Sequence, residues 1–185
     1  MEKIRIRNFK ATEDKILETA ICFGARFGLD SLSTLKMSKK LGISEGNIFF
    51  HFKTKDSLVA ACFKRIKEKI NSEVSLEKSK ESNNILNEFN LFINFAKKKT
   101  TYVKFLSSLY SSKYIKNIGE KNCKFDLLFI EKVKSIAKFS SLEEANSVCL
   151  LCMQTTISAA LNFEEGIIED NPSMRKVVYK NIFKF

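Results

Sequence analysis

Apolar residues recur at helical spacing along nearly the whole chain. In the segment 11–27 they stand at the i, i+3, i+4, i+7 positions of a helix with one buried face. These positions are Ile16, Leu17, Ala20, Phe23, Gly24 and Phe27. Gly28 follows, where a residue in the left-handed conformation would end the helix. The pattern therefore predicts a first helix over 11–27.

Two short helices joined by a turn are predicted next. Ser33 is a good N-cap for a brief helix through Lys40, and Ser44 is a good N-cap for a helix of about eight residues. Gly42 lies between them and can adopt a positive φ without steric cost. Two short helices joined by a turn that contains Gly form a helix-turn-helix unit, here at about 33–52.

The remaining pattern is also helical. Thr54 caps a further helix that runs to Ile70, and the polar stretch after Asn71 indicates a domain boundary. Beyond it, helices are predicted over 84–97, 101–111, 119–139, 142–163 and 172–183. We therefore expect an all-α chain with a basic arm at 1–10, a DNA-binding domain with a three-helix helix-turn-helix core at 11–71, and a C-terminal helical bundle at 72–185 for ligand binding and dimerisation.

Composition supports the helical assignment and narrows the partners. The 185 residues include one Pro and six Gly, so the residues that interrupt helices are scarce. The formal net charge of +11 favours polyanionic partners, and most of the excess lies in residues 1–70. The start of the chain shows no signal peptide, and the five cysteines are an odd number, so we expect a cytoplasmic protein without a disulfide framework. The charge-free segment 145–163 holds too many polar groups for a membrane span.

Three consecutive segments carry a family resemblance. They are ILETAICFGARFG at Ile16 to Gly28, LSTLKMSKKLGIS at Leu32 to Ser44, and GNIFFHFKTKDSL at Gly46 to Leu58. Their order and spacing resemble the DNA-binding domain of the TetR family of transcriptional regulators. The resemblance implies a homodimeric helix-turn-helix regulator, most often a repressor, with an inducer site in the C-terminal helices.

The candidate DNA contacts follow from the helix-turn-helix geometry, in which the second helix enters the major groove with its N-terminal residues at the base edges. Asn47 can bond adenine, Glu45 can accept from cytosine, Gly46 permits close approach, and Phe50 can contact a thymine methyl. The residues expected to hold phosphates are Ser33, Thr34, Ser44, His51, Thr54 and Lys55, with Lys36 and Lys53 at the periphery.

Two aromatic residues, Phe49 and His51, bear on how this segment contacts phosphates. His51 fits either a phosphate contact or packing against the neighbouring phenylalanines. Phe49 stands where the resembling family usually has Tyr, so a hydroxyl that could reach a phosphate is missing. We expect Phe49 and Phe52 to be core residues.

In the C-terminal part, aromatic and aliphatic positions spread over several predicted helices can enclose a hydrophobic or amphipathic ligand, as the resemblance implies, or simply fill the core. The candidate pocket residues are Phe92, Phe95, Tyr102, Phe105, Leu109, Tyr110, Phe125 and Phe129. A seam mostly of small residues would let another helix approach closely, either a partner's helix in a dimer or a helix of the same subunit. The candidate dimer residues are Ala145, Cys149, Cys152, Thr156, Ala159, Phe163, Val178 and Ile182.

The sequence favours a regulator over an enzyme. It shows no nucleophile paired with a base, no Gly-rich phosphate loop and no metal-ligand cluster, and a single His excludes a multi-histidine site. We expect no cofactor, a near-palindromic double-stranded DNA operator, a homodimer, and release by a small hydrophobic effector. The alternative is a DNA-binding dimer of the same fold that a protein partner controls.

Overall fold

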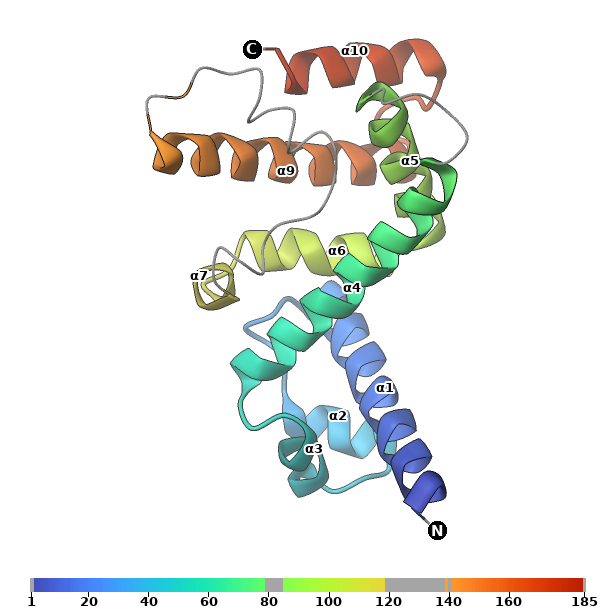
Figure 1. The fold of residues 1–185 in the computed structure, drawn as a ribbon, viewed down its shortest axis with the longest axis vertical. Coiled ribbons are helices and arrows are strands. Elements are labelled where there is room, and N and C mark those ends of the chain that lie inside the picture. Colours follow the sequence, from blue (N-terminus) through green and yellow to red (C-terminus); the bar gives the residue numbers. More distant parts are fainter. Residues whose placement is uncertain (1, 79–84, 119–138, 140, 185) are drawn as a thin grey trace. The chain divides into compact units, whose positions relative to one another are not determined.

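The computed structural model describes residues 2–78, 85–118, 139 and 141–184, and the regular structure of these residues is helical (Figure 1). The predicted all-α class is therefore confirmed. The helices are α1 (Glu2–Phe27), α2 (Thr34–Leu41), α3 (Glu45–His51), α4 (Lys55–Lys78), α5 (Ile85–Lys98), α6 (Thr100–Tyr110), α7 (Tyr114–Ile118), α9 (Leu142–Glu164) and α10 (Pro172–Ile182). The helix predicted over 119–139 lies almost entirely outside the described residues.

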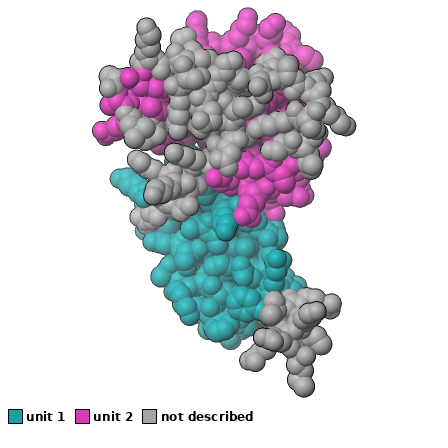
Figure 2. Space-filling model, in the orientation of Figure 1, with its two compact units in different colours: residues 1–66, 104–123 teal, residues 67–103, 124–185 magenta. Residues whose placement is uncertain are grey.

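The chain forms two compact units (Figure 2). Unit 1 comprises residues 1–66 and 104–123, and unit 2 comprises residues 67–103 and 124–185. The expected boundary at residue 71 falls inside α4, which continues to Lys78. Both α4 and α6 begin in one unit and end in the other. The division is therefore not sequential along the chain.

Gly24 explains why residues after 103 join the N-terminal helices. A Cβ at Gly24 of α1 would lie 2.7 Å from the Cδ2 atom of Phe105 and 2.8 Å from the Cδ2 atom of Leu29. Only glycine leaves room for the buried Phe105 ring, so Phe105 of α6 lies directly against α1 at this position inside unit 1.

The N-terminal residues do not form a separate arm, because α1 begins at Glu2. No Gly or Pro interrupts the chain from Glu2 to Phe23, so nothing local ends the helix. Phe9 adds a tertiary contact, since its ring lies 4.2 Å from the His51 ring, centroid to centroid. The basic N-terminal turns are thus an extension of α1.

The predicted caps at Ser33 and Ser44, the left-handed Gly42 and the start of the last helix at Pro172 are confirmed. Ser33 and Ser44 cap α2 and α3, with their hydroxyl oxygens accepting from the backbone N–H groups of Lys36 and Asn47. Gly42 ends α2 in the left-handed conformation with φ of 66°. At the other end of the chain, Asn171 caps α10 immediately before Pro172.

In unit 1 a small core holds the helix-turn-helix on α1 and α4. Its fully buried side chains include Ile16, Ile21, Met37, Ile48, Leu58 and Phe63. On the surface, the Arg65 guanidinium of α4 bonds Asp14 and Glu18 of α1, with N–O distances of 2.8 Å for both pairs. These contacts fix α4, and with it the segment that follows α3.

In unit 2, α5 packs on α9, and α10 packs on both (Figure 1). The Arg175 guanidinium of α10 forms a two-pronged ion pair with Asp170, and its Nη1 donates to Asn94 Oδ1 of α5 at 2.9 Å. Lys97 of α5 also pairs with Asp170. We call these four residues the Asp170 clamp. It fastens α10 to α5.

The small-residue seam of α9 lies inside this packing. Ala145, Cys152, Thr156, Ala159 and Phe163 are buried within the single chain. The Thr156 hydroxyl donates to the Cys152 carbonyl at 2.7 Å, which satisfies its hydrogen bonding without a partner molecule. Burial of these five residues favours the alternative in which a helix of the same subunit uses the close approach that small side chains permit, and their place in a dimer interface stays a prediction. Cys149, Val178 and Ile182 are half-buried.

Candidate nucleic-acid interface

The first turn of α3 is capped and open to solvent. The Ser44 hydroxyl accepts from the Asn47 N–H at 3.1 Å, and Ser44 and Gly46 are exposed. Asn47 is half-buried, so part of its amide remains accessible. The N-terminal turn of a helix presents free backbone N–H groups and the positive end of the helix dipole. This turn therefore suits a polyanion.

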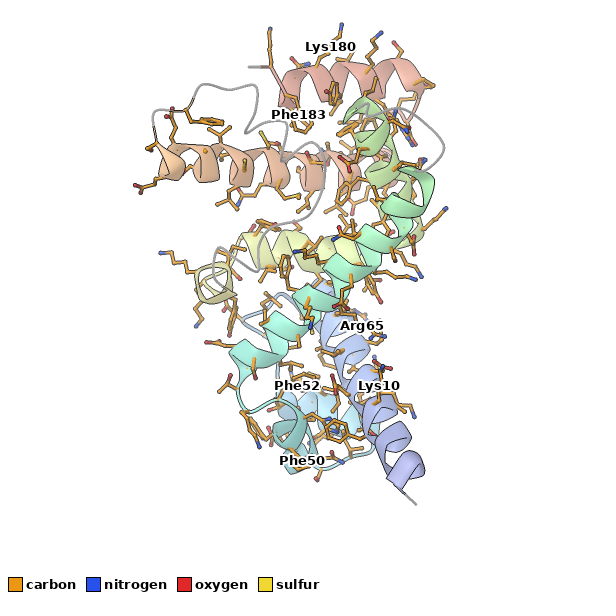
Figure 3. The ribbon with its side chains drawn as sticks, in the orientation of Figure 1. Lys10, Phe50, Phe52, Arg65, Lys180 and Phe183 are labelled. Carbon is orange, nitrogen blue, oxygen red and sulfur yellow. The ribbon has the colours of Figure 1, made fainter. Side chains whose placement is uncertain are left out.

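The back of α3 is held by two residues one helical turn apart. Ile48 is fully buried and Phe52 is 8% exposed, whereas Phe49 and Phe50 are 43% and 64% exposed. Figure 3 labels Phe50 and Phe52 at α3 and its end. The expectation that Phe49 is a core residue was therefore wrong. Positions 48 and 52 share one face of the helix, and each residue step turns the helix by about 100°, so position 49 leaves that face. Two adjacent phenyl rings are left at the surface.

Thr34 and Glu45 are joined, which the sequence pattern did not predict. The Thr34 hydroxyl at the start of α2 donates to the Glu45 carboxylate at the start of α3. Both residues are candidate DNA contacts, one for phosphate and one for cytosine. The contact links the first turns of the two helices of the motif.

Lys55 is the best-anchored cation of the candidate set. Its Nζ donates to the Asp30 carbonyl at 3.1 Å and lies 5.5 Å from the centroid of the Tyr114 ring. Thr54, one residue earlier, caps α4 by accepting from the Ser57 N–H at 3.0 Å. The start of α4 is thus fixed beside α3.

The other candidate cations are less constrained. Lys36 and Lys53 are exposed, and the Lys53 Nζ lies 5.8 Å from the centroid of the Phe50 ring. Ser33 is half-buried as the N-cap of α2. The structure therefore brings all the candidate DNA residues onto α2, α3 and the start of α4, within unit 1.

His51 packs among aromatic rings. Besides Phe9 at 4.2 Å, it contacts Phe50 edge-on at 5.8 Å and Phe52 at 6.3 Å, all between ring centroids. Its Nδ1 atom is buried and has no hydrogen-bond partner among the described residues. These contacts favour the packing interpretation, and a phosphate contact by His51 stays a prediction.

Three residues of this site escaped sequence reasoning: Phe9, Asp30 and Tyr114. Asp30 acts through its backbone carbonyl, and Tyr114 is distant from Lys55 in sequence, so neither leaves a signal in a local pattern. For Phe9 there was a signal, since an apolar residue in a basic segment indicates a packed position.

The predicted ligand pocket is divided between the units. Phe92, Phe95 and Tyr102 belong to unit 2, and Phe105, Leu109 and Tyr110 belong to unit 1. Phe125 and Phe129 lie outside the described residues. An open groove of about 440 Å³ lies along the end of α10, and none of the predicted pocket residues lines it.

Cys152 of α9 lies in a buried environment. Burial, and to a smaller extent the neighbouring Cys149, raises the pKa of the Cys152 thiol to about 11, so Cys152 does not supply a reactive thiolate near neutral pH. The described parts of the chain hold no group of three or more His, Cys, Asp or Glu that could bind a metal ion. None of the described helices is long and apolar enough to cross a membrane.

The capped and exposed α3, which follows α2 after a turn at Gly42, has the arrangement of a helix-turn-helix motif. Comparison with known proteins agrees. Residues 16–62 match the family described as "Bacterial regulatory proteins, tetR family". The nucleoid occlusion factor SlmA of Haemophilus ducreyi is 26% identical over 85 residues, a match that covers 45% of this chain and 42% of that protein.

Solved structures extend the likeness to nearly the whole chain. A tetR family transcription regulator from Shewanella sp. PV-4 has a TM-score of 0.76 at 15% identity, covering 93% of this chain and 96% of that one. The fatty acid degradation regulator FadR from Bacillus halodurans has a TM-score of 0.63 at 14% identity, with coverages of 92% and 97%. At these identities the structures establish the fold. The N-terminal segment therefore resembles the tetR family, and the chain has the fold of these regulators.

Proposed function

We propose that this chain is a dimeric transcriptional repressor that binds a near-palindromic operator through α3 of each copy. The observation that carries the proposal is the capped and exposed first turn of α3, inside the segment that matches the family. Asn47 and Gly46 lie at the base edges, and Lys55 and the helix N-termini hold phosphates. The net charge of +11 favours the approach to DNA.

Gel-shift titration tests the DNA contacts, with the operator taken from a genome-wide footprint. Lys55→Ala lowers affinity for all sequences and reduces the salt dependence by about one ion, whereas Asn47→Ala relaxes sequence choice. Lys98→Ala removes an exposed charge from unit 2 and serves as the control. If Lys55→Ala and Asn47→Ala both behave like this control, α3 does not dock as proposed.

We place the dimer contact on the exposed face of α9 rather than on the buried seam. No charged residue occurs from Ala145 to Phe163, although one side of this helix faces solvent. The exposed residues described in this stretch are Ser147, Leu150, Leu151, Thr155 and Ser158. A long solvent face without charges is unusual for a monomer and suits a second copy of the chain.

A pair of matched variants tests this placement. Leu151 of α9 is 59% exposed, and Leu35 of α2 is 51% exposed. Leu151→Glu puts a charge into the proposed interface and yields monomers in sedimentation velocity, whereas Leu35→Glu leaves the dimer intact. A dimer that survives Leu151→Glu contradicts the assignment.

Repression is relieved, in this proposal, by a small hydrophobic or amphipathic effector that contacts the predicted aromatic set, with Tyr102 or Tyr110 as hydroxyl partners. Binding changes the separation of the two α3 helices, so both half-sites can no longer be engaged together. A panel of lipophilic compounds in a thermal shift assay tests it. Absence of stabilisation by every compound counts against an effector.

The second candidate is the same dimer controlled by a protein partner. One observation favours it: Phe92, Phe95, Phe105 and Leu109 are completely or nearly completely buried and fill space as core residues do. A compound that releases the operator supports the first candidate, and release only by a cell protein supports the second.

A further inference from the structure

Lys55 is held by two groups that lie far from it in sequence. It is the first residue of α4, where the proposed function places a phosphate of the DNA backbone. Its Nζ donates to the Asp30 carbonyl, which precedes α2, and lies 5.5 Å from the ring centroid of Tyr114, the first residue of α7. All three residues belong to unit 1.

Of the two side chains Lys55 and Tyr114, the Tyr114 ring is the more firmly fixed. Tyr114 is 5% exposed, and its N–H donates to the Ser112 hydroxyl, which itself donates to the Leu109 carbonyl of α6 at 2.8 Å. A buried tyrosine has two side-chain torsions to fix, whereas lysine has a flexible four-carbon stem. The ring therefore limits where the ammonium can go.

The geometry leaves Lys55 able to bind an anion. A lysine ammonium has three N–H donors, of which one is used by the Asp30 carbonyl. The ring attracts the cation through its face without consuming a lone pair or neutralising the charge. Lys55 is half-buried, so the ammonium still reaches solvent. Fixing a side chain before it binds removes part of the entropic cost of binding.

We propose that Tyr114 is a positioning residue for DNA binding: its ring holds Lys55 in place for a backbone phosphate. The inference rests on the proposed function, since Lys55 must meet DNA. It adds Tyr114, a residue that acts on DNA binding through Lys55 and does not itself need to touch DNA.

The test uses the full chain and a fluorescent duplex of mixed sequence, about 30 base pairs long, because a phosphate contact does not depend on base sequence. Binding is measured by anisotropy over a range of salt concentrations. The variants are Tyr114→Phe, which keeps the ring, Tyr114→Leu and Tyr114→Met, which remove it but keep apolar volume, and Lys55→Gln. Each Tyr114 variant is also made in the Lys55→Gln background, and thermal unfolding identifies any variant that is not folded.

The expected result is that Tyr114→Leu and Tyr114→Met weaken binding by about two- to tenfold, while Tyr114→Phe binds like the parent. In the Lys55→Gln background the same changes at position 114 have no further effect. Equal losses in both backgrounds, or parental affinity after loss of the ring, overturn the proposal. These failures are distinct from failure of the proposed function, in which the parent chain itself does not bind DNA.

Discussion

Removing the carboxylate of the Asp170 clamp gives the sharpest test of how unit 2 is held together. In Asp170→Asn the side chain keeps its shape but loses the charge that faces Arg175 and Lys97. The Arg175 Nη2–Asp170 Oδ2 distance is 2.7 Å, and the side chains of Asp170 and Arg175 are 13% and 15% exposed. The variant therefore leaves a mostly buried guanidinium without its counter-ion.

The expected cost follows from these contacts. A hydrogen bond between charged groups contributes about 1.5–3 kcal/mol. Arg175 makes two such bonds to Asp170, and the amide oxygen of the introduced Asn would keep one of them as a bond to a neutral acceptor. The contact with Lys97 contributes less than about 1 kcal/mol, because the Lys97 side chain is 42% exposed. We expect a loss of about 2 kcal/mol of unfolding free energy, which lowers the midpoint temperature by about 4–8 °C.

The effect depends on pH in a defined direction. The pKa of Asp170 lies well below its ordinary value, mainly because Arg175 donates hydrogen bonds to the carboxylate. Burial opposes this effect but is outweighed, and the nearby Lys97 lowers the pKa further. The clamp therefore stabilises the folded chain fully above the unfolded pKa of about 4 and loses its contribution as pH falls through the folded pKa. The difference between parent and variant is thus largest near neutral pH and shrinks in strong acid.

Urea unfolding followed by circular dichroism measures this difference, since the chain has no Trp to report by fluorescence. The exposed neighbour Glu169, changed to Gln, controls for the loss of one negative charge. A gap between the parent and Asp170→Asn that stays constant from pH 7 to strong acid would refute an electrostatic clamp. So would a gap no larger than that of Glu169→Gln.

Further predictions concern unit 1. Gly24→Ala gains about 1 kcal/mol of helix propensity, but its Cβ forces the Phe105 ring aside at a cost of about 1–3 kcal/mol. Thermal unfolding should therefore show net destabilisation, and adding Phe105→Leu to the same chain should remove the clash and restore stability. Ser44→Ala removes the cap of α3 and costs about 1 kcal/mol in urea unfolding, and an unchanged midpoint contradicts the capping role. Replacing operator thymines by uracil weakens binding of the parent but not of Phe50→Ala, measured by gel shift, if Phe50 contacts a thymine methyl.

Local chemistry explains what could be predicted from the sequence. The caps at Ser33 and Ser44, the left-handed Gly42 and the Pro172 start depend on residues within one helical turn, so a single sequence is enough to find them. The position of the helix-turn-helix follows from these ends. The candidate DNA residues consequently fall on the right elements.

Long-range packing explains what could not be predicted. The side of α9 that is buried depends on α5 and α10, so a seam of small residues shows close packing but not which helix provides it. Phe49 was misplaced for a related reason, because an apolar residue next to buried Ile48 looks like core until the helix phase is known. Similarly, nothing near Tyr114 in sequence indicates that its ring lies over Lys55.

The passage of α4 and α6 between the units has a practical consequence for fragments of this protein. A fragment of residues 1–71 would contain the whole helix-turn-helix but lack Phe105 and Tyr114, so the surface around Gly24 and the ring beside Lys55 would be missing. We therefore expect that such a fragment would not be an autonomous module that could be transplanted to another regulator. A fragment that keeps unit 1 intact has to extend beyond residue 71 and include Phe105 and Tyr114. Exchanging DNA-binding domains by a simple fusion at residue 71 would therefore break unit 1.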